Sequence, residues 1–226
     1  MAIYGSNVYV LDASRKGYVK GFRIVRNALV PVPSWTRSLN FAEGLTPRFV
    51  NTPGQVGFTP DGKHLVVTTK ANGSAIEVFD VRANGSLSDS PVVTTSTNPV
   101  PFGFTFDSSG HLVVTEASNS SLTTYKLNGD VYKKLSSIPN GQAALCWIAK
   151  AGGGYFYGAN AGSNSVTGYK IDAVFRPSIV GNTPTSGGPI DLAASKDGKN
   201  LYVQTGLEGL VDQLRINTDG SLTKIG

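Results

Sequence analysis

From Pro53 onward the sequence repeats itself about every 45 residues, and this period constrains the fold more than any other feature. The repeats open on short apolar runs at Pro53, Pro101, Ala144 and Pro189. After each opening come a glycine-containing turn, a second apolar run and an alternating segment. A period of about 40 to 50 residues with four short strands is typical of β-propeller blades. We therefore predict a β-propeller of four-stranded antiparallel blades.

Alternation of apolar and polar residues indicates strands rather than helices. It recurs once per repeat, in residues 76–81, 122–127, 166–171 and 211–216. Such alternation buries one face of a strand and leaves the other in polar surroundings. Phe79, Tyr125 and Tyr169 hold equivalent positions, so we expect these rings to wedge between adjacent sheets. No window has convincing helical spacing, and the chain is predicted to be all-β.

An earlier copy of the alternating segment at Val19–Ile24 brings the number of repeats to five. We expect a single propeller domain with repeats at residues 1–52, 53–98, 99–142, 143–187 and 188–226. Nothing before Asn7 resembles an innermost strand, so the count is about 19 strands with one inner strand missing. Either five blades close on themselves or the chain is part of a larger propeller with exposed sheet edges. We favour the second.

Composition narrows the function classes. The net charge is +5, and the basic residues are scattered rather than gathered into a stripe, so no nucleic-acid partner is expected. The single cysteine, Cys146, excludes an internal disulfide and a cysteine-based zinc site. There is no signal peptide and no apolar run of membrane length. We therefore expect no membrane partner and a cytoplasmic chain, unless a full-length parent is secreted.

The motifs at the strand starts resemble a known family. They are residues 7–11, 21–24, 55–62, 101–106 and 144–147. They are similar to the lactonase family of seven-bladed propellers, which includes 6-phosphogluconolactonase and carboxymuconate cyclase. The resemblance covers essentially the whole chain and implies that it corresponds to the last five blades. It also implies hydrolysis or formation of a sugar-acid or aromatic-acid lactone, without a metal or other cofactor.

The family's functional positions map onto this sequence with changes. Its histidine-rich turn corresponds to Pro53-Gly54-Gln55, and its Arg-His pair corresponds to Phe102-Gly103. Glu116 lies one residue from the position of the family's acidic residue. A shift of one residue turns a strand side chain to the other face.

Inner-strand starts converge on the channel mouth of a propeller, and they predict a site there. Glu116 or Asp191 would activate water, and Lys70 or Arg48 would hold the anionic group of the substrate. The remaining predicted substrate-binding residues are Gln55, Phe102, Cys146, Trp147 and Asn160. In the alternative interpretation, Gln55 and Asp191 hydrogen-bond neighbouring backbones, and Cys146 is a small buried apolar residue.

Two other features bear on the site. His64 and His111 follow hairpin turns, which places them at the blade edge opposite the inner-strand starts. Neither is expected to be catalytic or to share a metal with the other. The segment from Pro31 to Thr52 is about ten residues longer than its counterparts. We expect it to lie at the rim of the channel, where it would act as a lid or contact a partner. Alternatively, its aromatic residues cover an exposed blade face.

Two functions follow. The first is a lactonase-like propeller that acts on an anionic lactone or carboxylate at the channel mouth. The second is a non-catalytic propeller that binds a ligand or a protein at its rim. Self-association through open blade edges is a further expectation.

Overall fold

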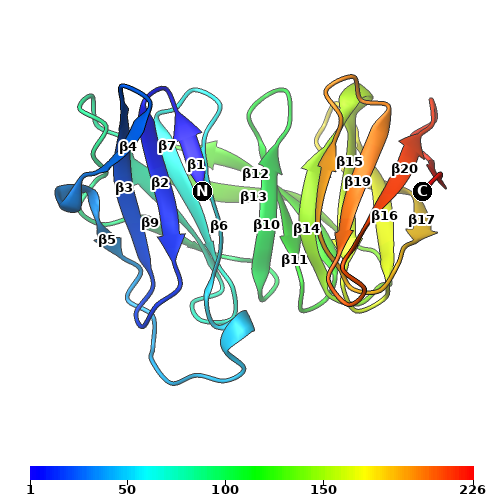
Figure 1. Ribbon diagram of the computed structural model, residues 1–226, viewed down its shortest axis with the longest axis horizontal. Helices are drawn as coiled ribbons and strands as arrows, with labels where there is room; N and C mark the ends of the chain where they lie inside the picture. Colours follow the sequence, from blue (N-terminus) through cyan, green and yellow to red (C-terminus); the bar gives the residue numbers. More distant parts are fainter. The chain divides into compact units, whose positions relative to one another are not determined.

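The computed structural model describes residues 1–226, and its strands form five sheets (Figure 1). Each sheet contains four consecutive strands that neighbour one another in sequence order. In the first sheet a further short strand, β5, pairs with β3. The prediction of an all-β chain with five repeats of four antiparallel strands is confirmed.

Strands of the first two sheets lie between residues 2 and 95. The first sheet contains β1 (Ala2–Tyr4), β2 (Asn7–Asp12), β3 (Tyr18–Val25), β4 (Ala28–Pro31) and β5 (Arg37–Ser38). The second sheet contains β6 (Pro53–Phe58), β7 (His64–Thr69), β8 (Ala75–Asp80) and β9 (Val92–Thr95).

Strands of the other three sheets follow in the same order. The third sheet contains β10 (Pro101–Phe106), β11 (Leu112–Glu116), β12 (Ser121–Asn128) and β13 (Val131–Pro139). The fourth contains β14 (Leu145–Lys150), β15 (Tyr155–Asn160), β16 (Ser165–Ile171) and β17 (Pro177–Pro184). The fifth contains β18 (Pro189–Ala194), β19 (Asn200–Thr205), β20 (Leu210–Ile216) and β21 (Leu222–Lys224).

Helical structure is limited to three short 3₁₀ turns. They are η1 (Pro33–Trp35), η2 (Arg48–Val50) and η3 (Gly152–Gly154). The structure contains no helix with the length and apolar character needed to cross a bilayer.

The expectation of a missing first strand is wrong. Ala2–Tyr4 forms β1, which pairs antiparallel with β2 in a register that sets Tyr4 opposite Asn7. The two residues between them make a tight hairpin, and Gly5 supplies the positive φ of 57° that such a turn needs. Three residues are too few to show an alternating pattern, so the sequence alone gave no sign of this strand.

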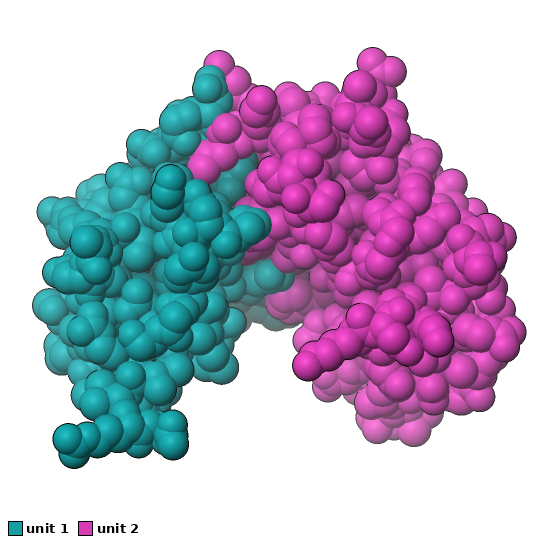
Figure 2. Space-filling model, turned by 90° about the horizontal axis from the view of Figure 1, so that it is seen from above, with its two compact units in different colours: residues 1–101, 128–132 teal, residues 102–127, 133–226 magenta.

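The chain divides into two compact units, coloured separately in Figure 2. Unit 1 comprises residues 1–101 and 128–132, and unit 2 comprises residues 102–127 and 133–226. The core of unit 1 packs Tyr9, Val19 and Trp35 of the first repeat against Leu65 and Phe79 of the second sheet. Unit 2 has two buried clusters, one around Tyr169 and Phe156 and one around Leu201 and Leu214.

Rings at the equivalent positions of the alternating strands are buried, as predicted. The exposed fractions of Phe79, Tyr125 and Tyr169 do not exceed 1%. Burial of three large rings removes much apolar area from water, and this stabilises the packing of the sheets.

The long segment between β4 and β6 covers the core of unit 1 with some of its aromatic residues. Trp35 stacks on Tyr9 with ring centroids 5.9 Å apart, and Phe41 is also buried. A Cβ on Gly21 would lie only 2.4 Å from the Cβ of Trp35, so glycine makes room for this ring. Phe49, in contrast, is 70% exposed. The aromatic-cover interpretation therefore holds for Trp35 and Phe41, but not for Phe49.

Candidate functional site

A cavity of about 390 Å³ lies in unit 1, beside the start of β6. Its lining comes from the turn between β2 and β3 and from the connection between β5 and β6. The volume is within the range of small-molecule sites, which is about 300 to 1,000 Å³. The lining residues are Ala13, Arg15, Ala42, Glu43, Gly44, Leu45, Thr46, Arg48, Asn51 and Thr52.

Backbone hydrogen bonds hold the two lining segments together. The amides of Leu39 and Phe41 donate to the carbonyls of Gly17 and Lys16, each at 2.9 Å. The ring of Phe41 packs over Gly17, whose φ of +67° suits glycine. These contacts fix the side of the cavity next to the β2–β3 turn.

Two buried side chains from the turn between β7 and β8 hold the connection between β5 and β6 in place. The side-chain amide of Asn72 donates to the carbonyl of Ala42 at 2.9 Å and accepts from the Ala42 amide at 3.3 Å. The ammonium group of Lys70 donates to the carbonyl of Phe49. Lys70 is buried and lies outside the cavity lining, so it contacts the loop backbone rather than the cavity.

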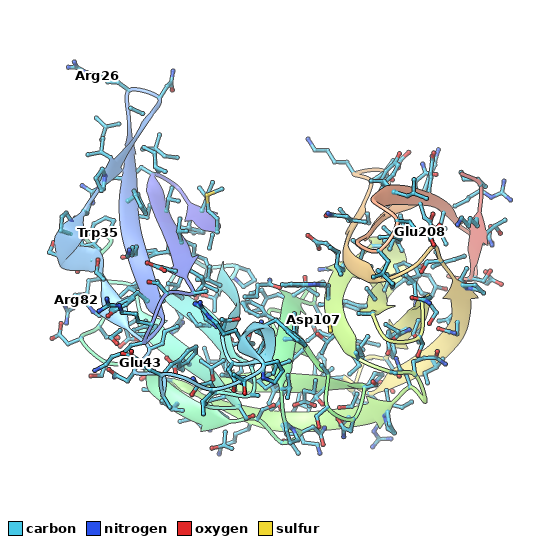
Figure 3. The ribbon with its side chains drawn as sticks, turned by 60° about the horizontal axis from the view of Figure 1, so that its bottom comes forward. Arg26, Trp35, Glu43, Arg82, Asp107 and Glu208 are labelled. Carbon is cyan, nitrogen blue, oxygen red and sulfur yellow. The ribbon has the colours of Figure 1, made fainter.

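Cationic groups outnumber anionic ones in this lining. Arg15 and Arg48 contribute two positive charges and Glu43 contributes one negative charge, which gives a formal charge of +1. All three side chains are exposed, and none of them belongs to an ion pair. Glu43 is labelled on the β5–β6 connection in Figure 3. Guanidinium groups are planar, bidentate donors that suit carboxylates and phosphates.

The strand pairing shows which residues are equivalent at the ends of the second strands of the sheets. Thr69, Glu116, Asn160 and Thr205 each pair with the first residue of the third strand of their sheet. Lys70 and Gln204 lie one residue away from these positions, so neither is equivalent to Glu116 or Asn160. The displacement puts Gln204 on the opposite face of its sheet.

At the start of the first strands the register shifts. Pro53, Leu145 and Pro189 pair with the last residues of β7, β15 and β19, and an irregularity follows each of them. Trp147, rather than Cys146, therefore takes the position equivalent to Asp191. An extra residue in a strand re-aims the side chains beyond it.

Glu116, a predicted catalytic residue, is completely buried at the end of β11. Its Oε1 accepts from the hydroxyl of Tyr125 at 2.7 Å. Its Oε2 accepts from Ser121 Oγ at 3.0 Å and from Thr123 Oγ1. Three hydroxyl donors thus satisfy a carboxylate that has no exposed surface.

Asn160 belongs to a similar network in the fourth sheet. Its side-chain nitrogen donates to Ser165 Oγ at 3.0 Å and to Thr167 Oγ1 at 2.9 Å. Its side-chain oxygen accepts from Asn140 at 2.8 Å, and the same Asn140 nitrogen donates to the hydroxyl of Tyr169. Asn160 is fully buried, so these bonds contribute to sheet packing.

Phe102 and Trp147 lie together in unit 2, with ring centroids 4.9 Å apart in an edge-on arrangement. A Cβ on the intervening Gly103 would lie 2.8 Å from the backbone oxygen of Cys146, so the two first strands approach closely here. Cys146 is buried, and its carbonyl accepts from Thr115 Oγ1. This contact brings together three of the predicted substrate-binding residues.

Asp191 belongs to the fifth sheet, in unit 2, and Gln55 belongs to the second sheet, in unit 1. Asp191 is exposed and lines a shallow groove of about 200 Å³ with Tyr202 and Gln204. Its Oδ1 accepts from the Leu192 amide at 2.8 Å. The Gln55 amide donates to Thr68 Oγ1 at 2.9 Å. The contact of Gln55 is made by its backbone amide, and that of Asp191 is with the next residue along the strand, so both interpretations of these residues stay predictions.

The sequence analysis did not identify Arg15 and Glu43 as candidate site residues. Of the predicted set, only Arg48 lines the cavity with them. The unusual length of the segment from Pro31 to Thr52 was the signal that could have identified Glu43. Arg15 is one of the scattered basic residues, and no pattern in the sequence links it to the loop. The catalytic assignments of Glu116 and Asp191 stay predictions.

No protein-family model matches this sequence, and no curated protein matches it. Solved structures are similar to the whole chain. A protein from Lactobacillus plantarum has a TM-score of 0.86 at 16% identity over 100% of this chain and 69% of its own. The periplasmic gluconolactonase PpgL of Pseudomonas aeruginosa has a TM-score of 0.80 at 18% identity, over 98% and 67%. A provisionally assigned 6-phosphogluconolactonase of Bacteroides uniformis has a TM-score of 0.78 at 17% identity, over 96% and 66%.

These similarities identify the fold. The five sheets match about two thirds of the length of seven-bladed β-propellers, and the predicted fold class is confirmed. The structural neighbours include lactonase-family propellers, as the resemblance of the sequence implied.

Proposed function

We propose that this protein binds the anionic group of a sugar-acid or carboxylated lactone in the cavity of unit 1 and opens or closes the lactone ring. One observation carries the proposal. Two arginines without carboxylate partners and one glutamate line a single cavity of about 390 Å³. The fold supports it too, since a gluconolactonase is among the similar structures.

The chemistry needs a base and a donor. In hydrolysis, a carboxylate takes a proton from water while the oxygen of that water attacks the lactone carbonyl carbon. A guanidinium stabilises the oxyanion that forms, and the ring C–O bond then breaks as the leaving oxygen takes up a proton. Glu43 is the carboxylate of the cavity, and Arg15 or Arg48 would hold the substrate's anionic group. Glu116 and Asp191 remain the bases proposed from the sequence.

A non-catalytic binding function is the second candidate. The burial of Glu116 under three hydroxyl donors favours it, because that carboxylate contacts no solvent. In this case the cavity would bind an anionic sugar acid without turnover.

Two measurements on the same proteins separate these candidates. Calorimetric titration with gluconate and 6-phosphogluconate measures binding, and a pH-stat assay with the corresponding lactones measures ring opening. The variants are Arg15→Ala, Arg48→Ala and Glu43→Gln, together with Glu116→Gln and Asp191→Asn. The control is Arg26→Ala, because Arg26 lies in the β3–β4 turn, at the other end of β3 from the cavity (Figure 3).

We expect each cavity arginine to contribute about 1.5 to 3 kcal/mol, which is a loss of roughly 10-fold or more in affinity when it is removed. Loss of turnover with retained binding in Glu43→Gln would assign the base. Binding without turnover in every protein would favour the second candidate. Equal affinity in Arg15→Ala, Arg48→Ala and Arg26→Ala would refute the cavity as the site.

A further inference from the structure

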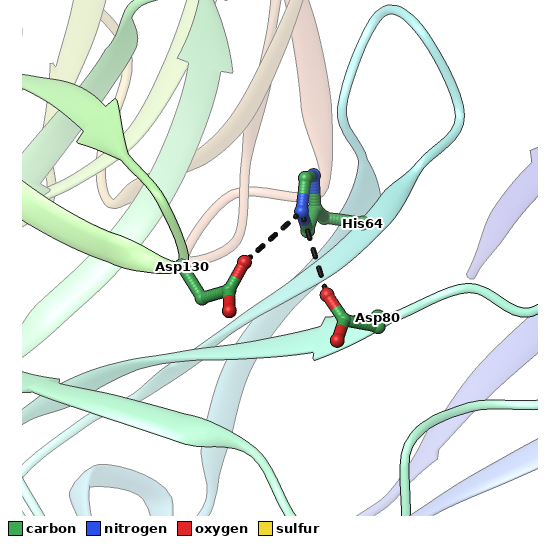
Figure 4. A group of neighbouring side chains, drawn as sticks. All are labelled: His64, Asp80 and Asp130. Carbon is green, nitrogen blue, oxygen red and sulfur yellow. Dashed lines mark ion pairs between the residues drawn. The ribbon is translucent and has the colours of Figure 1, made fainter.

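Three side chains that can bind metal converge at one edge of unit 1 (Figure 4). His64 begins β7 and Asp80 ends β8, and the two are paired directly across the sheet. Asp130 comes from the turn between β12 and β13, which belongs to the same unit. The Nε2 of His64 lies 3.5 Å from Oδ1 of Asp80 and 3.5 Å from Oδ1 of Asp130.

These separations suit a shared metal ion better than hydrogen bonds. Good N–H···O bonds have donor–acceptor distances of about 2.7 to 3.2 Å. Ligands at about 2.0 to 2.1 Å from a tetrahedral zinc ion are about 3.4 Å from one another. The three ligand atoms all lie within 4.8 Å of one another. Both aspartates have exposed side chains that can rotate to shorten the remaining distance.

Burial and charge favour a cation at the same point. The side chain of His64 is only 17% exposed, whereas those of Asp80 and Asp130 are 58% and 45% exposed. The imidazole is thus fixed by packing, and the carboxylates leave a side open to water. Asp61 adds a third carboxylate near His64, and the neighbouring Lys63 is 76% exposed. Carboxylates therefore outnumber cationic groups here, which favours a divalent ion.

We propose that His64, Asp80 and Asp130 form a binding site for a divalent first-row transition ion, with Zn²⁺ as the best chemical fit. One imidazole nitrogen and two carboxylate oxygens are ligands that zinc accepts, and water would complete a tetrahedral set. The ion would hold the turn of residues 128–132 against the second sheet. This edge lies at the opposite end of β7 from the cavity, about 17 Å away along six residues of strand. Its role is therefore structural and independent of the lactone chemistry.

The third sheet provides a natural comparison. His111 immediately precedes the corresponding strand, β11, but its Nδ1 contacts a single carboxylate oxygen, Asp107 Oδ2, at 3.0 Å. That distance is an ordinary hydrogen bond. The other side of the ring packs on Phe175, with centroids 3.7 Å apart. One carboxylate and an apolar neighbour do not make a metal site, so His111 is the matched control.

Zinc binding is measured on the full chain without a polyhistidine tag. The protein is dialysed against ZnCl₂, and its metal content is determined by plasma mass spectrometry. Titration with Zn²⁺ then gives the affinity, and the absorption spectrum of the Co²⁺-loaded protein reports tetrahedral ligands. The chain has only two histidines and one buried cysteine, so background binding is low.

We expect one Zn²⁺ per chain, with at least roughly a 10-fold loss of affinity in Asp80→Asn and in Asp130→Asn. His111→Gln should bind as the unchanged protein does. Both aspartates are exposed, so these two variants should fold, and thermal melts would verify this. The proposal is overturned if the unchanged protein binds no zinc, or if the aspartate variants bind it as tightly as His111→Gln does. Neither result would affect the proposed function of the cavity.

Discussion

The hydroxyl of Tyr9 donates to the carbonyl oxygen of Gly85 at 2.6 Å, which ties β2 of the first sheet to the β8–β9 turn of the second. Unit 2 contains the same bond, from Tyr157 of the fourth sheet to Gly220 of the fifth at 2.9 Å. Burial raises the pKa of the Tyr157 phenol to about 12, so the group is a neutral donor. In each unit, a tyrosine on the second strand of one sheet thus bonds to a glycine in the last turn of the next sheet.

We predict that Tyr9→Phe and Tyr157→Phe each lower the free energy of unfolding by about 1 to 3 kcal/mol, because a buried carbonyl loses its donor. Urea denaturation measures the change. Tyr155→Phe is the control, since its hydroxyl lies 3.5 Å from the Thr218 carbonyl, too far for a strong bond. A Tyr155→Phe variant as unstable as the other two would contradict this prediction.

Glu77 is a buried carboxyl on the face that packs into the core of unit 1. It is paired directly with Val67 across β7 and β8, is 8% exposed, and its Oε2 has no hydrogen-bond partner. Burial raises its pKa from 4.5 to about 7. The folded protein therefore binds a proton between these pH values that the unfolded chain does not. The contribution of Glu77 to the free energy of unfolding is therefore fully present below pH 4.5 and is lost as the pH rises to 7.

We predict that this loss is about 3 kcal/mol, at about 1.4 kcal/mol per pKa unit, and that Glu77→Gln removes it. Thermal melts between pH 4.5 and 8 would test the sign and the size. The variant should gain stability relative to the unchanged protein as the pH rises. Glu43→Gln, at an exposed position, should follow the unchanged protein. Parallel pH profiles for Glu77→Gln and the unchanged protein would rule out the prediction.

Replacement of the buried Glu116 distinguishes a structural role of its carboxylate from a catalytic one. Its two oxygens accept from three hydroxyl groups, and an amide in Glu116→Gln replaces one acceptor atom with a donor. We predict a loss of about 1 to 3 kcal/mol in unfolding free energy. Chemical denaturation measures it, and the pH-stat assay on the folded variant measures activity. Unchanged stability with abolished turnover would instead favour the catalytic role.

Asn72 positions the wall of the cavity through its two hydrogen bonds to Ala42. We predict that Asn72→Ala increases hydrogen exchange in residues 39–52 and weakens binding of 6-phosphogluconate, while β7 stays protected. Mass spectrometry of exchanged peptides reads out the loop and the strand separately. Asn72→Asp keeps the acceptor for the Ala42 amide and should give an intermediate result. Protection of the loop in Asn72→Ala equal to that in the unchanged protein would show that Asn72 does not hold it.

The repeat predicted the fold well because strand alternation is a local property. Phe79, Tyr125 and Tyr169 are buried where the alternating pattern placed them. The three residues of β1 escaped notice because so short a segment has no period. The sequence does not show that Trp147 is equivalent to Asp191, because a register irregularity leaves no trace in it.

The candidate site was only partly predictable. Arg48 was identified from the long loop, but its neighbours Arg15 and Glu43 were not, because loop closure brings together residues far apart in sequence. Lys70 and Glu116 looked like accessible charges at strand ends. Lys70 is buried beneath the loop and Glu116 under three hydroxyl groups, and such burial depends on neighbours from other segments.

The sequence by itself determined an all-β chain of five repeats, since side-chain period and turn glycines act within a few residues. Only the tertiary structure decided which charged groups meet. The cavity of Arg15, Glu43 and Arg48 and the cluster of His64, Asp80 and Asp130 each join residues from separate strands or turns. Electrostatic and metal-ligand interactions act over a few ångströms in space, whatever the separation along the chain.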